Sequence, residues 1–298
     1  CEEAWLPHFF YVSLRQIKVI IFIIKQRMIK LYDLLTEQIG KKPKAIILAG
    51  APGAGKGTVL KDLNLDGLKI LNVDNIYIEK LKQANISLDL KNATPEERSE
   101  QAKLMAASNK EFKGDLAATI EGKESFVLDG TAASYKQTSA LKSELEAAGY
   151  DVMMFYVHAS LERVLQQNQN RFEKSGGEDR SLAPAIVMRT WMNVVKNYKP
   201  YRDLFGGYAT SKFGLVSNTL DGDKLTNIED IIDKYLTPFK PTGTKEKTPA
   251  QQARSNKQYA EMKDEIQRLL DSKELEDLES DSLSAEEAQM RINDFLRL

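Results

Sequence analysis

The sequence predicts an α/β protein with a five-stranded parallel sheet between two layers of helices, followed by a helical C-terminal tail. Two observations predict this fold. Short apolar runs of the kind that form buried parallel strands recur along the chain, and helical patterns separate them. The runs are residues 44–50, 69–73, 125–129, 151–157 and 213–217. Strands that alternate with helices form a parallel sheet covered on both faces, which gives three layers.

Charge and cysteine content limit the partners. The 298 residues carry a formal net charge of -1, so no global attraction draws the chain to nucleic acid or to an anionic membrane. Small-molecule partners are therefore expected. The single cysteine, Cys1, excludes an internal disulfide and fits a reducing compartment, so we expect a cytoplasmic location.

Residues 1–40 are expected to form an N-terminal extension and a leading helix. The apolar stretch 9–24 is interrupted by charges, and its uncharged run is far shorter than the ~20 residues that cross a bilayer. No small-residue cleavage site of a signal peptide follows it. We interpret residues 1–27 as upstream sequence translated in frame, with Met28 as the natural start, and expect no membrane role.

Two helix starts have clear signals. Thr94, Pro95 and Glu97 provide an N-cap, a first-turn proline and a capping-box acid before a long polar helix. Thr226 and Glu229 repeat the box before a shorter apolar helix. Both patterns place helices between or after the predicted strands.

The chain changes character near residue 240. Residues 239–256 have little to bury and are predicted to be a linker, so we assign 241–298 to a linker and a helical tail. Helical spacing of apolar residues follows, and a second capping box precedes a short helix. The residues are Tyr259, Met262, Ile266 and Leu269 for the first helix, and Ser284, Glu287, Ile292 and Phe295 for the second. We expect the tail to pack on the core or on a protein partner.

A glycine-rich loop, GAPGAGKGT, joins the first predicted strand to a helix. A triphosphate needs several backbone N–H groups in one concavity, and glycines let the backbone turn that tightly. The following helix adds its positive end, and Lys56 reaches the β- and γ-phosphates. A glycine-rich connecting turn is the alternative, which the strand before and helix after disfavour. We assign nucleotide binding to Gly50, Ala51, Pro52, Gly53, Ala54, Gly55, Lys56, Gly57 and Thr58.

The end of this P-loop departs from the usual pattern. The position after Lys56, which usually holds a Mg²⁺-binding Ser or Thr, is Gly57, and the hydroxyl follows at Thr58. This arrangement resembles the loop of adenylate kinases and related nucleoside monophosphate kinases, over about residues 44–218. The resemblance implies that waters and carboxylates hold the metal, so Thr58 is assigned to phosphate, with only a weak metal role.

The acceptor side lacks the arginines of adenylate kinases. The third predicted strand runs into VLDGTAAS, whose Asp129 matches the acid of that family, and NVDNIYIEKL follows the second strand with Asp74. This layout resembles the zeta-toxin and polynucleotide 5′-hydroxyl kinase group. The resemblance implies that Asp74 takes the proton of an acceptor hydroxyl. Asp129 is assigned to Mg²⁺, through water. The alternatives are a helix N-cap for Asp74 and a turn before Gly130 for Asp129.

Residues 160–184 are predicted to form a helix, a glycine-containing turn and the start of a second helix, with a lid near 172–183. Phosphoryl transfer spreads negative charge that arginines neutralise. Paired arginines around a short loop resemble the lid of these kinases, which implies that Arg171 and Arg180 close over the phosphates. Solvated helix charges are the alternative reading.

Other residues near the predicted lid and strand ends have weaker assignments. Arg163 and Arg189 are reserve lid arginines, and Gln167 stands where related enzymes have another arginine. Asn218, at the end of the last strand, is assigned to the adenine. His158 has no Cys or His neighbours in sequence that would suggest a zinc site, so we expect a structural role.

These assignments predict that residues 41–240 form a P-loop kinase domain. It would use ATP and Mg²⁺ to phosphorylate a hydroxyl of a small acceptor, such as a sugar nucleotide, a nucleoside or a nucleic-acid end, with long nucleic acid not favoured. Two alternatives stay open: a nucleoside monophosphate kinase, and a nucleotide-switched interaction module whose tail binds a partner.

Overall fold

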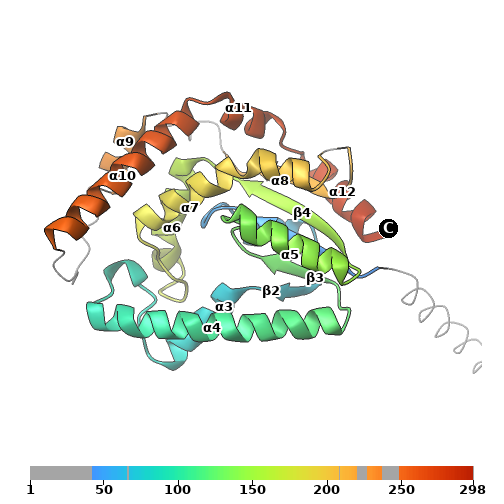
Figure 1. Cartoon of the computed structure of the whole chain (residues 1–298), viewed down its shortest axis with the longest axis horizontal. Helices are drawn as coiled ribbons and strands as arrows, with labels where there is room; N and C mark the ends of the chain where they lie inside the picture. The colour runs from blue at the N-terminus through green and yellow to red at the C-terminus, as the bar shows by residue number, and fades with distance from the viewer. Residues whose placement is uncertain (1–41, 66, 208, 220–226, 237–247, 298) are drawn as a thin grey trace, which may run out of the picture. The chain divides into compact units, whose positions relative to one another are not determined.

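Five parallel strands form one sheet in the order β2-β3-β1-β4-β5, which confirms the predicted α/β fold (Figure 1). The computed structural model describes residues 42–65, 67–207, 209–219, 227–236 and 248–297. The predicted N-terminal extension and leading helix lie outside these ranges.

The strands and helices follow one another in the alternating order that a parallel sheet requires. In chain order they are β1 (Lys44–Ala49), α2 (Lys56–Asp62), β2 (Lys69–Leu71), α3 (Val73–Gln83), the 3₁₀ turn Leu90–Asn92, α4 (Pro95–Glu121), β3 (Phe126–Asp129), α5 (Tyr135–Ala147), β4 (Asp151–His158), α6 (Leu161–Lys174), α7 (Pro184–Lys196), α8 (Tyr198–Leu204), β5 (Phe213–Ser217), α9 (Ile228–Tyr235), α10 (Pro249–Leu270), α11 (Lys273–Ser280) and α12 (Ala285–Arg297).

The central strand β1 is buried along its whole length, and all of its residues after Lys44 are apolar, because helices cover both of its faces. Ile46 and Leu48 belong to one hydrophobic cluster, whereas Ala45, Ile47 and Ala49 belong to the other. This alternation is the two-residue period of a strand. β1 therefore lies between two cores and its carboxyl end carries the loop that follows.

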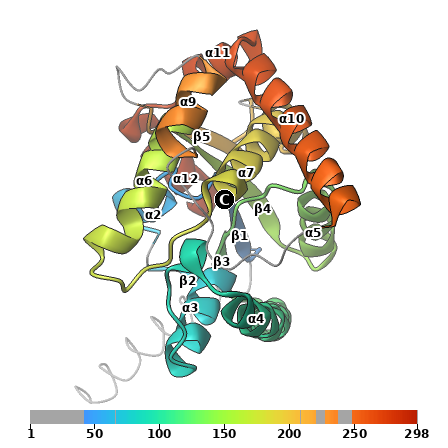
Figure 2. The same ribbon diagram turned by 90° about the vertical axis from the view of Figure 1, so that its left-hand side faces the viewer.

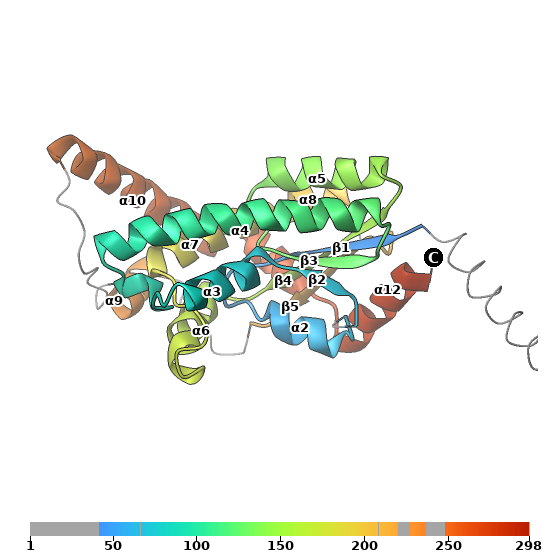
Figure 3. The same ribbon diagram turned by 90° about the horizontal axis from the view of Figure 1, so that it is seen from below.

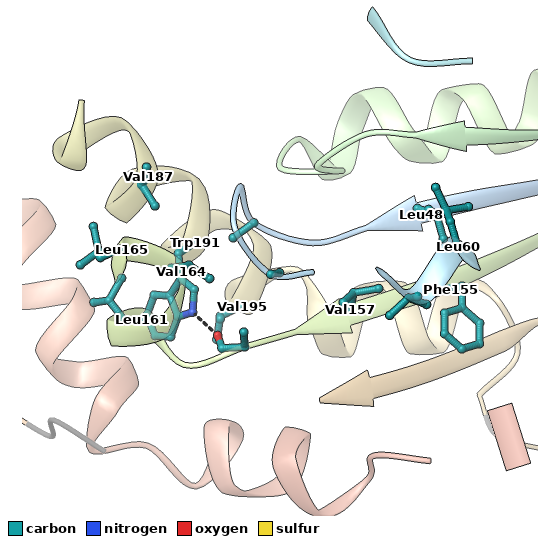
Figure 4. Close-up of a cluster of buried hydrophobic side chains, with 14 of the residues drawn as sticks. Leu48, Leu60, Phe155, Val157, Leu161, Val164, Leu165, Val187, Trp191 and Val195 are labelled. Atoms are coloured by element: carbon teal, nitrogen blue, oxygen red, sulfur yellow. Dashed lines mark hydrogen bonds between the residues drawn. The ribbon is translucent and has the colours of Figure 1, made fainter. Parts of the chain in front are cut away.

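The first core joins the sheet to helices from the whole length of the chain. Figure 4 shows Leu48 and Phe155 from the sheet with Leu60 from α2, and Trp191 from α7. The indole Nε1 of Trp191 donates a hydrogen bond of 3.0 Å to the carbonyl of Ala159. Trp191 is thus buried with its polar atom satisfied, which fixes α7 to the end of β4.

The second core lies under α5 and α8. Tyr156 of β4 is fully buried there and donates to the carbonyl of Val194 at 2.8 Å. Helices α3 and α4 lie side by side (Figure 3), and Leu104 and Met105 of α4 pack against a smaller cluster that contains Tyr77 and Leu81 of α3. This helical pair connects β2 to β3 and so projects from the carboxyl end of the sheet's edge.

The C-terminal tail completes the first core. Ile292 and Phe295 of α12 are buried in the same cluster as Leu48, and α10 runs beside α7 and α9 (Figure 2). The backbone N–H of Leu283 donates to Leu215 of β5 at 2.9 Å, and the N–H of Ser217 donates to Ser282 Oγ at 2.8 Å. The tail segment thus pairs with the edge strand.

Two local expectations were wrong, and one alternative reading, the capping role of Asp74, is excluded. The second strand ends at Leu71 instead of residue 73, because Asn72 caps α3 with a side-chain bond to the N–H of Asp74. Asp74 is therefore not the cap. The predicted linker ends early, because Pro249 begins α10 with a capping box at Thr248.

Two of the other capping predictions are confirmed. The box at Thr94 and Glu97 is present, as is the pair Ser284 and Glu287. Helix α9 begins at Ile228 with Asn227 as its cap, and Thr226, the predicted cap, lies outside the described ranges. Within the described parts of the chain, no helix is both long and apolar enough to cross a membrane.

Candidate active site

The glycine-rich loop lies between β1 and α2, where its glycines are required by the backbone. A Cβ on Gly50 would lie 2.6 Å from the carbonyl oxygen of Val157. Gly53 and Gly55 have φ of +88° and +91°, in the left-handed region that favours glycine. Gly57 differs, because a Cβ there would meet nothing within 4 Å. The predicted loop is therefore tightly constrained at three of its four glycines.

Lys56 begins α2 and folds back over the loop. Its Nζ donates to the carbonyl oxygens of Gly50 at 2.9 Å and Ala51 at 3.3 Å. Burial lowers the pKa of this ammonium from its ordinary value. The lysine is thus held at the mouth of a concave loop, where a phosphate oxygen would be a stronger partner for it than a carbonyl.

Asn218 closes the loop from the other side. Its Nδ2 donates to the carbonyl of Ala54 at 2.7 Å, and its backbone N–H donates to His158 at 2.8 Å. The observed contact of Asn218 is therefore with the phosphate loop, and the predicted adenine contact stays a prediction. His158 is buried and its Nε2 has no partner; burial lowers its pKa to about 3.

Two carboxylates lie at the ends of neighbouring strands. Asp129 ends β3, and Asp74 lies in the first turn of α3, three residues beyond the end of β2. Asn72 Nδ2 donates to Asp129 Oδ2 at 2.6 Å, while Asp129 Oδ1 is buried without a partner. Burial raises the pKa of Asp129, and the neighbouring Lys56 ammonium and the Asn72 bond oppose this rise.

The predicted lid lies between α6 and α7. Arg180 is buried and its Nη2 forms an ion pair with Asp74 Oδ2. Arg171 Nε pairs with Asp179 Oδ2 at 2.6 Å. The lid segment also contacts the helical pair, because Ser181 Oγ donates to Asp89 Oδ1 at 2.6 Å. The structure thus connects the lid to the segment between α3 and α4.

The candidate catalytic groups come from separate segments but form one electrostatic cluster. The charges that shift the pKa of Lys56 include those of Asp129, Arg171, Asp74 and Arg180. Charges of both signs interact more strongly where water is partly excluded. Lys56, Asp74, Asp129, Arg171 and Arg180 therefore lie near one another at the carboxyl end of the sheet.

The positions of Arg163, Arg189 and Gln167 differ from those of the two main lid arginines. Arg189 is exposed on α7, and Arg163 lies in the first turn of α6. Gln167 packs against the phosphate loop, since its Cβ would lie 3.3 Å from a Cβ on Gly53. Helix α6 therefore supports the loop with an uncharged residue at this position.

A magnesium ion fits this cluster only as part of a nucleotide complex. No three His, Cys, Asp or Glu side chains gather at metal-binding distance in the part of the chain that the structure describes. Asp129 nevertheless offers a buried oxygen, Oδ1, that lacks a partner. Mg²⁺ prefers oxygen ligands and keeps several waters, so one carboxylate with phosphate oxygens would suit it.

Sequence reasoning missed two features of the site. Asn72 was not singled out, although an Asn directly after a strand and before a helix is a recognisable capping signal. The contact of Ser181 with Asp89 spans 92 positions, so no local pattern could reveal it.

A P-loop that carries Lys56, faced by carboxylates and arginines on a parallel sheet, defines a P-loop kinase. The zeta toxin family model matches residues 31–199, and the chain belongs to this family. No curated protein matches the chain.

Three solved structures are among those to which the chain is similar. The PezAT toxin-antitoxin system of Streptococcus pneumoniae is 16% identical, with 83% of this chain and 96% of that chain covered and a TM-score of 0.40. AvrRxo1-ORF1:-ORF2 with ATP is 18% identical, with 86% and 81% covered and a TM-score of 0.46. Shikimate kinase from Acinetobacter baumannii in complex with shikimate is 18% identical, with 67% and 95% covered and a TM-score of 0.34. The family assignment stands on the family model alone.

Proposed function

We propose that this kinase transfers the γ-phosphoryl group of ATP to a hydroxyl of a small acceptor. A sugar nucleotide, a nucleoside or a nucleic-acid 5′ end would supply such a hydroxyl. The observation that carries the proposal is the place of Asp74. Its side chain is 40% exposed, yet it lies within the electrostatic cluster around Lys56. A carboxylate that is both reachable and close to the phosphate loop is the group a hydroxyl acceptor needs.

A cavity beside the cluster supports a neutral acceptor. It measures about 400 Å³ and begins at Thr131, whose carbonyl accepts a bond from the N–H of Gly50 in the phosphate loop. Hydroxyl, amide and methyl groups line it, and no charged side chain does. The lining residues are Thr131, Ala132, Ala133, Ser134, Gln137, Thr138, Leu141 and Asn193. A monophosphate acceptor would call for arginine here, because arginine pairs with phosphate in two parallel bonds.

The chemistry follows from these positions. The acceptor oxygen attacks the γ-phosphorus, the bond from that phosphorus to the β-bridging oxygen breaks, and ADP leaves. The proton of the acceptor hydroxyl passes to a carboxylate oxygen of Asp74. Lys56, Arg171 and Arg180 neutralise the charge that spreads over the moving group. Mg²⁺, when bound with ATP near Asp129, supplies further neutralisation of the phosphate oxygens.

The test is a panel of acceptors with labelled ATP. Nucleosides, sugar nucleotides and oligonucleotides with a 5′-hydroxyl are compared with AMP, and Lys56→Ala serves as the inactive control. We expect phosphate to pass to at least one hydroxyl acceptor and ATP affinity of Lys56→Ala to fall about tenfold or more, since a charged hydrogen bond contributes ~1.5–3 kcal/mol. Transfer to AMP alone would instead identify a nucleoside monophosphate kinase.

Tight ATP binding without transfer to any acceptor would favour the nucleotide-switched module. In that case a partner would be sought, starting with the exposed face of α10. Calorimetry with Mg²⁺ separates both outcomes from a failure to bind nucleotide, which would contradict the assignment of the loop.

A further inference from the structure

Asn72 lies between the two candidate catalytic carboxylates and contacts both segments that carry them. Its Oδ1 accepts a bond of 2.7 Å from the backbone N–H of Asp74. Its Nδ2 donates a bond of 2.6 Å to Oδ2 of Asp129. One uncharged side chain therefore joins the start of α3 to the end of β3.

The sheet explains why the two segments meet at this residue. β2 and β3 are parallel neighbours, and Leu71 is paired with Leu128. Asn72 and Asp129 each follow directly after that pair, so their side chains leave the sheet side by side. The contact is thus fixed by the register of two strands and does not depend on the flexible part of a loop.

We propose that Asn72 is a positioning residue for the Mg²⁺–ATP complex. Its amide holds Asp129 by one oxygen and leaves the other, Oδ1, without a protein partner and available to the metal or to its waters. The inference rests on the proposed function, because it takes Asp129 to act on Mg²⁺. It gives a role to Asn72, which the sequence motifs do not assign.

Simple helix capping does not account for the side chain. A cap needs only the acceptor oxygen, as Asn227 shows: its Oδ1 accepts from the N–H of Glu229 at 3.0 Å at the start of α9. Asn72 makes that bond and adds a donor bond to the half-buried carboxylate of Asp129. An aspartate would cap equally well, but it has no donor for Asp129 and would add a negative charge.

This difference supplies a matched pair of variants. Asn72→Asp keeps the size and the capping oxygen and removes the donor. Asn227→Asp makes the same chemical change at a cap that has no carboxylate partner among the residues that the structure describes. ATP binding is measured by calorimetry for each protein over a series of Mg²⁺ concentrations and also in EDTA. Unfolding midpoints in urea report on folding, and kcat and KM are measured on the best acceptor.

We expect Asn72→Asp to need about 10- to 100-fold more Mg²⁺ for the same gain in ATP affinity, as is typical when the partner of a metal ligand is changed. Its affinity for ATP in EDTA should fall by a smaller factor than its affinity in Mg²⁺, because the added charge repels ATP in both conditions and only the metal contribution is lost in one, and kcat should fall more than KM changes. Asn227→Asp should match wild type in every binding measurement.

Equal Mg²⁺ dependence in Asn72→Asp and wild type would overturn the proposal, as would an equal loss of affinity with and without Mg²⁺. If Asn72→Asp does not fold, Asn72→Ser, which retains a capping oxygen but is too short to reach both partners, is measured in the same way. A wild-type protein whose ATP affinity does not respond to Mg²⁺ would also overturn it. The binding measurements need no acceptor, so a wrong acceptor class would leave this result intact.

Discussion

Arg180 of the lid segment forms an ion pair with Asp74 in the first turn of α3. The arginine side chain is 10% exposed and the aspartate 40%, so the pair sits at the border of the site and not in open solvent. The guanidinium of Arg180, which we assign to the phosphates, is therefore paired with the carboxylate of Asp74, which we assign to the acceptor. A nucleotide would compete for Arg180, and its binding would release Asp74 for the acceptor.

Asp74→Asn tests the base directly. We expect kcat to fall about 100- to 10,000-fold, because an amide cannot take the acceptor proton. ATP affinity should hardly change, since Lys56 and the loop are intact. Rates come from transfer assays and affinity from calorimetry. A variant with unchanged kcat would reduce Asp74 to a first-turn acid of α3.

Arg180→Gln tests the lid. The substitution removes the charge that should move to the phosphates, so we expect kcat/KM to fall about tenfold or more. Arg254→Gln, on the exposed surface of α10, is the matched control and should behave as wild type. The assignment fails if the two variants show the same kinetics.

Substitution by alanine should lower ATP affinity at Gly50 and leave it unchanged at Gly57. Gly50→Ala would force a methyl to 2.6 Å from a carbonyl oxygen, so the loop must shift and ATP affinity should drop at least tenfold. Gly57→Ala meets nothing and should bind ATP like wild type, with helix α2 unchanged or up to ~1 kcal/mol more stable. Calorimetry and urea unfolding measure both. Similar losses in the two variants would contradict the loop geometry.

His158 should make the protein less stable in mild acid. Its folded-state pKa is lowered to about 3, so between its ordinary pKa of 6.5 and that value only the unfolded chain takes up the proton. The free energy of unfolding contributed by this residue is therefore complete above pH 6.5 and falls by about 1.4 kcal/mol per pH unit below it.

Urea unfolding of wild type and His158→Leu between pH 4.5 and 7.5 measures this component. Carboxylates contribute to the slope of both proteins, so the difference between the two curves isolates the imidazole. We expect the wild type to lose stability faster than the variant as the pH falls. Parallel curves would show that His158 is protonated in the folded protein.

The tail should stabilise the kinase although it follows the last strand. Phe295 is buried in the core that contains β1, whereas Met290, one turn earlier on α12, is 56% exposed. Phe295→Ala should lower the free energy of unfolding by about 3–5 kcal/mol, and Met290→Ala by much less. Urea unfolding gives both values. A tail that folds independently of the sheet would instead leave the main transition unchanged in Phe295→Ala.

Much of the fold was predictable because local patterns decide it. All five strands were found, since each is a short apolar run buried between helices, and 213–217 agrees at both ends. The second strand was predicted too long because Asn72 prefers to cap a helix, which outweighs the apolar Val73. Residues 249–256 were predicted to be linker because their side chains are polar, yet a capping box and contacts further along α10 extend the helix.

The site was predictable only as a set of separate candidates. The loop motif identified Lys56, and the strand ends identified Asp74 and Asp129, because parallel strands bring their carboxyl ends together. The pairing of Asp74 with Arg180 depends on how the segment between α6 and α7 approaches the first turn of α3. The bridge made by Asn72 depends on the register of β2 with β3, which no single segment encodes.

The hydrogen bonds that join Leu283 and Ser282 to β5 affect the tendency of the protein to aggregate. An uncovered outer strand offers a row of free amides and carbonyls to which a strand of another molecule can add. Here the chain's own tail occupies part of that row. A protein truncated before the tail would therefore lose buried surface and would also expose the edge of β5. Strands of other molecules could add to that edge, so we expect the truncated protein to aggregate.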